Sequence, residues 1–143
     1  MMQKALWYVE HQATHVHVKK LDDGAFIYYF LRKDHDAADA ISKTLVQAYE
    51  DTMCGKWPKR AACLDGLLDL TQCLHRVEES DDKWGCVECE MNPLKLVCSC
   101  KSCKGYGICS HILAVNHILR EYNVRYELHQ IGKRAAKYSG GNG

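Results

Sequence analysis

The N-terminal part of the chain alternates between apolar and polar positions in a way that predicts a β-hairpin. Val16 and Val18 alternate with polar neighbours, and residues 26–31 are apolar or aromatic at every position. The Asp23-Gly24 pair between these two runs is typical of a tight turn. Because a period of two indicates extended strands, we expect an antiparallel pair whose second strand is covered on both faces.

After the hairpin, the apolar spacing becomes helical. Asp36 is a suitable N-cap for a helix that runs to about residue 53, because Ile41, Leu45 and Tyr49 recur every four residues on one face. A second run of apolar positions, at spacings of three and four, predicts another helix from about residue 59. Its apolar positions are Cys63, Leu67, Leu70, Leu74 and Val77.

An acidic run at residues 78–82 contains no apolar residue and is the expected boundary of a second unit. Beyond it, residues 84–88 and 94–100 alternate like two short strands, and a helix is predicted from Ser110 to about Tyr122. The pattern therefore predicts an α+β protein. Its expected parts are a body of hairpin and two helices (1–80), a small ββα module (81–124) and a basic tail (125–143), in which residues 124–131 resemble a short strand and the rest a frayed end.

The chemistry is concentrated in the ββα module, within the segment CSCKSCKGYGICSH of residues 98–111. Cys98 and Cys100 are two apart on a predicted strand, so both side chains leave the same face. Cys109 and His111 are also two apart, which on one continuous helix would separate them by about 200°. They converge only if the helix begins between them, and Ser110 is suited to begin it. These four residues therefore form the predicted metal site.

Three thiolates and one imidazole, with no carboxylate among them, are typical of a closed structural zinc site. We therefore expect one structural Zn²⁺. Nearby lysines and a helix N-terminus would offset the net negative charge of the ligands. A catalytic zinc would keep a position open for water, so we expect no enzymatic activity. The surplus cysteines leave a rival set open: Cys86, Cys89, Cys100 and Cys103 would form an ordinary four-cysteine site.

The pattern Cys98-x-Cys100, eight residues, then Cys109-x-His111, followed by ILAV, resembles the SWIM zinc finger. The resemblance covers about residues 83–120 and implies a strand-strand-helix frame. SWIM modules occur in Mutator-like transposases, in regulators derived from them, in chromatin remodellers and in ubiquitin-ligase components. The resemblance implies a module that binds DNA or protein. Since 143 residues leave no room for a transposase catalytic domain, a chain of that lineage would be a fragment or a domesticated remnant.

Charge is distributed unevenly along the chain. Residues 1–94 carry a net charge of −5 and the remainder +6, although the whole chain is near neutrality at +1. Because the basic excess coincides with the zinc module, we expect contacts with the phosphates of DNA, with little sequence preference. The expected contacts are Lys101, Lys104, Arg120, Arg125, Lys133 and Arg134. The alternative is a protein-interaction module, of an adaptor or ubiquitin-ligase type, that docks a partner through Tyr106, Tyr122 and Tyr126.

Cysteine usage indicates the compartment. The chain has nine cysteines, an odd number, and its sequence contains neither a signal-peptide pattern nor an apolar run of membrane-spanning length. We therefore expect reduced or metal-bound thiols in the nucleus or cytoplasm. A membrane and a small-molecule substrate are not among the expected partners.

Overall fold

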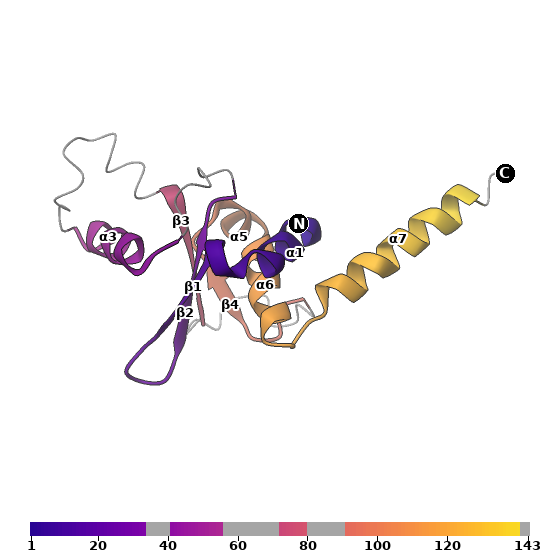
Figure 1. Cartoon of the computed structure of the whole chain (residues 1–143). Helices are drawn as coiled ribbons and strands as arrows, with labels where there is room; N and C mark the ends of the chain where they lie inside the picture. Colours follow the sequence, from indigo (N-terminus) through magenta and orange to yellow (C-terminus); the bar gives the residue numbers. More distant parts are fainter. Residues whose placement is uncertain (34–40, 56–71, 80–90, 141–143) are drawn as a thin grey trace.

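The computed structural model describes residues 1–33, 41–55, 72–79 and 91–140 and confirms the α+β class (Figure 1). These residues form six helices and one four-stranded sheet. In chain order the elements are α1 (Met2–Glu10), α2 (Gln12–His15), β1 (Val16–Lys20), β2 (Phe26–Leu31), α3 (Lys43–Met53), β3 (Leu74–Glu79), β4 (Leu96–Cys98), α5 (Lys101–Tyr106), α6 (Ser110–Ile118) and α7 (Val124–Gly140). No helix in the described ranges combines the length and hydrophobicity needed to cross a bilayer.

The predicted hairpin is confirmed. β1 and β2 pair antiparallel with Val16 opposite Phe30. Gly24 adopts a positive φ of 88° in the turn, and the Asp23 carboxylate accepts a hydrogen bond from the backbone N–H of Ala25 at 3.0 Å. An aspartate that bonds its own turn and a glycine in the left-handed region together define the reversal.

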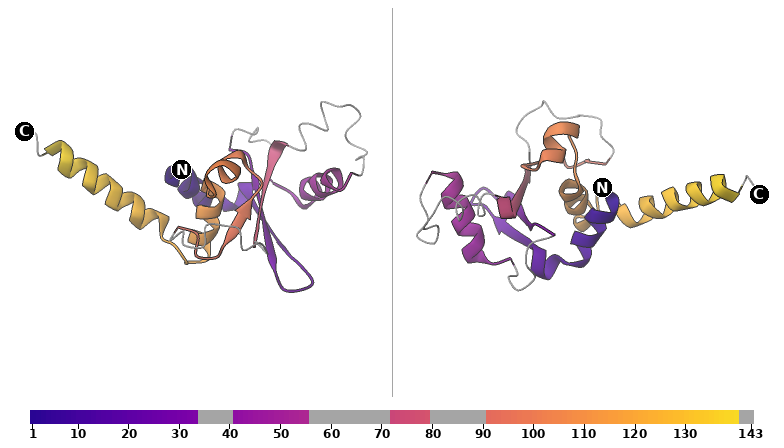
Figure 2. Two further views of the ribbon diagram at one scale, coloured as in Figure 1. Left: turned by 180° about the vertical axis from the view of Figure 1, so that it is seen from behind. Right: turned by 90° about the horizontal axis from the view of Figure 1, so that it is seen from above.

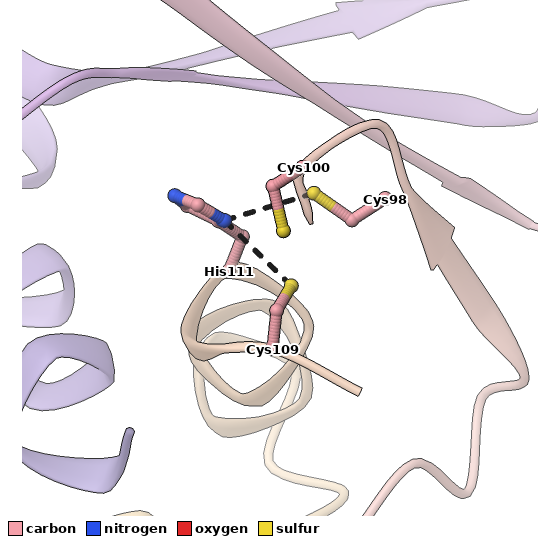
Figure 3. Close-up of side chains that lie close together, drawn as sticks. All are labelled: Cys98, Cys100, Cys109 and His111. Atoms are coloured by element: carbon pink, nitrogen blue, oxygen red, sulfur yellow. Dashed lines mark hydrogen bonds between the residues drawn. The ribbon is translucent and has the colours of Figure 1, made fainter. Parts of the chain in front are cut away.

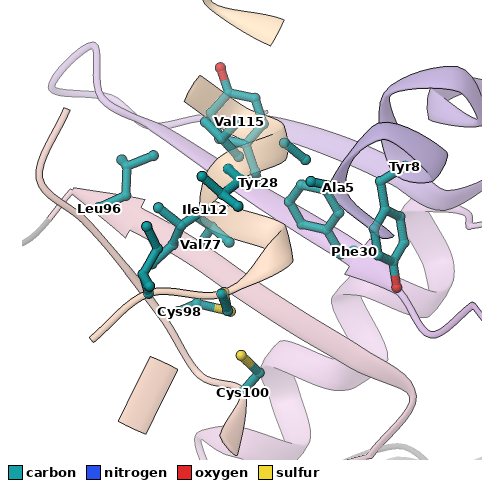
Figure 4. Close-up of a cluster of buried hydrophobic side chains, with 14 of the residues drawn as sticks. Ala5, Tyr8, Tyr28, Phe30, Val77, Leu96, Cys98, Cys100, Ile112 and Val115 are labelled. Atoms are coloured by element: carbon teal, nitrogen blue, oxygen red, sulfur yellow. The ribbon is translucent and has the colours of Figure 1, made fainter. Parts of the chain in front are cut away.

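The sheet is antiparallel in the order β1-β2-β3-β4, and helices cover both of its faces (Figures 1 and 2). Tyr28 and Phe30 face a core shared with α1 and α6 (Figure 4). Ile27, Tyr29 and Leu31 face the opposite way, toward a second core that includes α3. This arrangement confirms that both faces of the second hairpin strand are covered. The apolar positions of β2 are continuous because each face has its own core.

The helices of the body differ from the prediction in two ways. The helix expected after Asp36 begins instead at Lys43, because the hydroxyl of Ser42 caps it by accepting from the N–H of Leu45 at 3.1 Å. The helix expected from residue 59 to Val77 does not reach Val77, since Leu74 and Val77 belong to strand β3. Their spacing of three places Leu74 in one core and Val77 in the other. The earlier part of that predicted helix lies outside the described residues.

The chain turns at Asn92 before it enters β4. The Asn92 side chain pairs with the backbone of Leu96 through two hydrogen bonds of 3.0 Å, one donated and one accepted. β4 is shorter than the predicted strand 94–100, and the predicted strand 84–88 lies outside the described residues. Between Cys100 and Cys109, where the pattern predicts no helix, the chain forms α5. Gly107 ends α5 in the left-handed region at φ 75°.

The remaining helices were not predicted correctly. α1 and α2 were not expected at all, and residues 124–131 form the first part of helix α7 rather than a strand. The predicted frayed end is also wrong, because α7 continues to Gly140. Figure 1 and both views of Figure 2 show α7 extending away from the sheet. Among the described side chains of α7, only Val124, at the base of the helix, is fully buried.

The acidic run at residues 78–82, predicted to be a boundary, begins inside β3, where Glu78 pairs with Val97 and Glu79 with Leu96. Its other residues, 80–82, lie outside the described residues. Val77 in β3 pairs with Cys98 in β4, and α1 packs against α6. The body (1–80) and the module (81–124) therefore share both a sheet and a hydrophobic core.

Candidate metal centre

Cys98, Cys100, Cys109 and His111 converge at the junction of β4, α5 and α6 (Figure 3). Cys98 ends strand β4, and Cys100 is the residue before α5. Cys109 has extended backbone angles, φ −151° and ψ 173°, and helix α6 begins immediately after it. Helix α6 thus begins between Cys109 and His111, as the two-residue spacing of this pair predicts. Ser110 is the first helical residue, however, and the N-cap position belongs to Cys109.

The four ligand atoms have the separation that a small tetrahedral metal ion requires. They all lie within 4.8 Å of one another, and all four residues are buried. The Nδ1 atom of His111 is 3.6 Å from the Sγ atoms of both Cys98 and Cys109. A tetrahedral zinc centre with ordinary bond lengths places sulfur and nitrogen ligands about 3.6 Å apart. The residues present therefore fit one metal ion.

Crowding of the three sulfurs shifts the pKa values of the thiols in opposite directions. Hydrogen bonds with Cys109 and Cys98 lower the pKa of Cys100. A hydrogen bond to Cys100 raises the pKa of Cys98, and a separate hydrogen bond to Cys100 is the main cause that raises the pKa of Cys109 to about 12. The raised pKa values favour the protonated thiols of Cys98 and Cys109. A divalent cation must displace their protons to bind all three sulfurs, so metal affinity falls as pH falls.

Aromatic rings from the N-terminal half surround His111. Its ring centroid lies 5.2 Å from those of Tyr8 and Phe30, and 4.7 Å from that of His75. Its Nε2 atom is buried and has no hydrogen-bond partner among the described residues. Packing, rather than a hydrogen bond to Nε2, therefore holds the imidazole with Nδ1 toward the sulfurs.

Sequence reasoning missed these ring neighbours. The apolar run of β2 indicated that Phe30 would be covered, but nothing in the sequence named His111 as its neighbour. Burial lowers the pKa of His75 to about 4, and His111, Lys4 and Arg32 act in the same direction. His75 is therefore neutral beside the centre at pH 7.

Cys103 and His117 lie near the centre but have other partners. The Sγ atom of Cys103 accepts a hydrogen bond from the backbone N–H of Cys98 at 3.4 Å. The Nδ1 atom of His117 accepts from the backbone N–H of Val124 at 3.0 Å. The rival set of four cysteines includes Cys86 and Cys89, which lie outside the described residues.

The six residues expected to contact phosphates are all exposed, but they fall into two groups. Lys101 and Lys104 lie on α5. The other four follow α6 or lie on α7: Arg120, Arg125, Lys133 and Arg134. Figures 1 and 2 show α5 and the free part of α7 on separate parts of the molecule. Arg125 is also paired with Glu10, at 3.6 Å.

Two of the tyrosines expected to dock a protein partner, Tyr122 and Tyr126, differ in their exposure to solvent. Tyr126 is exposed on α7, whereas Tyr122 packs partly against the main core. The side chain of Tyr106 lies outside the described residues.

Comparison of the chain with protein-family models, curated proteins and solved structures finds no significant match. The resemblance to the SWIM pattern therefore rests on residues 98–111 themselves.

Proposed function

We propose that the Cys3His cluster holds one structural Zn²⁺ and that the chain is a zinc-stabilised nucleic-acid-binding module of SWIM type. The observation that carries the zinc assignment is the buried cluster of three sulfurs and one imidazole nitrogen within 4.8 Å of one another. Soft sulfur ligands with one imidazole favour zinc over magnesium or calcium, which prefer oxygen. Four protein ligands fill a tetrahedron, as in structural rather than catalytic sites.

A zinc ion at this position would link strand β4 to the start of helix α6. The sulfurs must be reduced to bind it, so we place the protein in a reducing compartment, the nucleus or the cytoplasm.

Native mass spectrometry tests the zinc assignment directly. The wild-type chain is expected to carry one zinc ion, and Cys109→Ala is expected to lose it. Cys103→Ala is the matched control, because the Cys103 sulfur bonds the backbone of Cys98 and is not one of the four ligands. Zinc retained by Cys109→Ala but lost from Cys103→Ala and Cys89→Ala would instead support the rival four-cysteine site.

Helix α7 is the element best suited to contact nucleic acid. Arg125, His129 and Lys133 follow one another at intervals of four, so they form one stripe along the helix. Lys133 and Arg134 are exposed on the part of α7 that extends away from the sheet (Figure 2). Lysine and arginine on a projecting helix bind phosphates through charge, with little dependence on base sequence.

A salt titration of DNA binding tests this assignment. The affinity for a duplex probe, measured by fluorescence anisotropy, is expected to fall steeply between 50 and 200 mM salt, values chosen to span the counterion-release range. Lys133→Gln and Arg134→Gln should each lower the slope of log affinity against log salt by about 1. Lys43→Gln, an exposed lysine on α3, is the matched control. The proposal would be contradicted if the chain did not bind DNA, or if all three variants lowered the salt slope equally.

One observation favours the alternative of a protein-interaction module. Val124, Leu128 and Ile131 form an apolar stripe on α7 that begins in the core and ends with Ile131 half exposed. A protein complex held by this apolar stripe would persist at high salt and be lost in Ile131→Gln. A complex with phosphates would dissociate at high salt and persist in Ile131→Gln.

A further inference from the structure

A second site lies where the N-terminal helix meets one end of the central strands of the sheet. A pocket of about 580 Å³ opens there between α1, the end of β2 and strand β3. The described residues that line it are Lys4, Tyr8, Arg32, Lys33 and His75. Three of them are cationic, none is acidic, and the volume is within the usual range for small-molecule sites, about 300–1,000 Å³. The residues of the pocket come from three separate segments, so no local sequence pattern indicates it.

The walls of the pocket are held in place by hydrogen bonds. The Tyr8 hydroxyl donates to the carbonyl of Leu31 at 2.9 Å and so fixes α1 to the end of β2. The backbone N–H of Arg32 donates to the carbonyl of Cys73 at 2.9 Å, which extends the pairing of β2 with the chain before β3. A site whose backbone is already ordered loses less conformational entropy when a ligand binds.

The cationic side chains approach the pocket from two directions. Lys4 lies one helical turn before Tyr8, so both are on the same face of α1. Lys33 lies over the ring of Trp7, with its Nζ atom 5.1 Å from the ring centroid. This cation–π contact orients the lysine without neutralising its charge. Arg32 is half buried, so its charge is less screened by solvent than that of an exposed arginine.

We propose that this pocket binds a phosphate monoester. Two lysines and an arginine match the two negative charges and several acceptor oxygens of a phosphate monoester, and arginine can bind it in a bidentate manner. A backbone phosphodiester has one charge and is a poorer match for three cations. The pocket is also much larger than a phosphate ion, so it has room for the organic group of the ester. The monoester is either a small phosphorylated molecule or the phosphorylated 5′ end of a nucleic-acid strand.

This site is separate from the stripe on α7 and does not depend on the function proposed above. His75 connects it to the metal centre, since the His75 ring also contacts His111. A ligand in the pocket would therefore lie against a residue that packs on the zinc ligands.

The test is a titration of the zinc-loaded, full-length protein with inorganic phosphate, followed by ¹H–¹⁵N NMR at low ionic strength. Saturable shifts are expected at the ends of α1 and β2. Lys4→Gln and Lys33→Gln should each weaken binding about fivefold or more, since each removes a charge-assisted hydrogen bond. Lys20→Gln, an exposed lysine at the end of β1, is the matched control and should change the affinity less than about twofold.

Two oligonucleotides of the same sequence, one with a 5′-phosphate and one without, distinguish the two sources of the monoester. Tighter binding of the phosphorylated strand, lost in Lys4→Gln, identifies a strand end. Equal binding of the two strands, with inorganic phosphate still bound, identifies a small phosphorylated molecule. Absence of saturable phosphate binding, or equal weakening by Lys20→Gln, would overturn the pocket assignment. If neither strand binds but phosphate does, the nucleic-acid function fails and the pocket remains.

Discussion

Helices α6 and α7 are neighbours in the sequence but lie in opposite environments. Every residue of α6 from Ser110 to Asn116 is buried, between the sheet and α1. Among the described side chains of α7 only Val124 is fully buried, and residues 131–134 are exposed. The two helices therefore have separable roles: α6 places the metal ligands within the core, and α7 presents charge to solvent. Changes at the metal centre should affect folding, and changes on α7 should affect binding.

Metal removal is expected to have the largest effect. Zinc binding in small modules contributes about 10–16 kcal/mol, which equals or exceeds the stability of most domains, about 5–15 kcal/mol. Because β2, β3 and α6 share one core, chelation should unfold both the body and the module in one step, as followed by circular dichroism. Cys109→Ala should behave likewise, whereas Cys54→Ala, at an exposed thiol, should resemble wild type.

Two separate transitions on chelation would contradict this expectation. They would show instead that the acidic run at residues 78–82 divides two units that fold independently, despite the shared sheet.

The next largest difference in stability is expected between a substitution at the base of α7 and a deletion of its C-terminal end. Val124→Ala removes fully buried methyl groups and should lower the free energy of unfolding by about 2 kcal/mol. Deletion of residues 132–143 should lower it by less than about 0.5 kcal/mol, because Gly132, Lys133 and Arg134 are exposed. Urea unfolding measures both. A large loss on deletion would mean that the end of α7 contributes to the core.

The stability of the zinc-loaded protein should decrease in mild acid, partly through His75. Burial lowers the pKa of His75 to about 4 in the folded chain, whereas an unfolded histidine has a pKa of about 6.5. The unfolded state therefore binds more protons in this window, and stability is lost as pH falls from about 6.5 toward 4. His75→Gln removes this contribution, so its unfolding free energy should fall less than that of wild type between pH 7 and 5. Equal losses would assign the whole effect to the metal ligands.

The smallest effect is expected for the ion pair at the base of α7. Arg125 and Glu10 are both largely exposed and 3.6 Å apart. Arg125→Gln should therefore change the unfolding free energy by less than about 0.5 kcal/mol. In the DNA titration it should lower the salt slope less than Lys133→Gln does, because Glu10 already neutralises part of its charge. An equal effect of the two variants would mean that DNA displaces Glu10.

The four metal ligands could be predicted because the features that bring them together lie within one short segment of the chain. Ligand type and spacing within 14 residues, together with the turn from extended to helical backbone after Cys109, determine which side chains converge. The hairpin was predictable for the same reason, since a period of two and the Asp23-Gly24 turn are short-range signals.

Apolar spacing alone misassigned Leu74 and Val77. A separation of three fits one face of a helix, and it equally fits a strand with a core on each face. Residues 124–131, predicted to be a strand and found in a helix, show the same ambiguity. Val124, Tyr126 and Leu128 fit a period of two, whereas Val124, Leu128 and Ile131 fit helical intervals of four and three. The choice between helix and strand depended on tertiary partners, which such short patterns do not specify.

The sequence by itself determined the α+β class, the hairpin and a set of four metal ligands, because these follow from local periodicity and donor chemistry. Only the tertiary structure decided what surrounds the centre. It packed His111 among Tyr8, Phe30 and His75, placed the basic residues of α5 apart from those of α7, and assembled the cationic pocket from three distant segments. These features depend on contacts between residues far apart in the chain, and hydrophobic packing sets them only when all the elements come together.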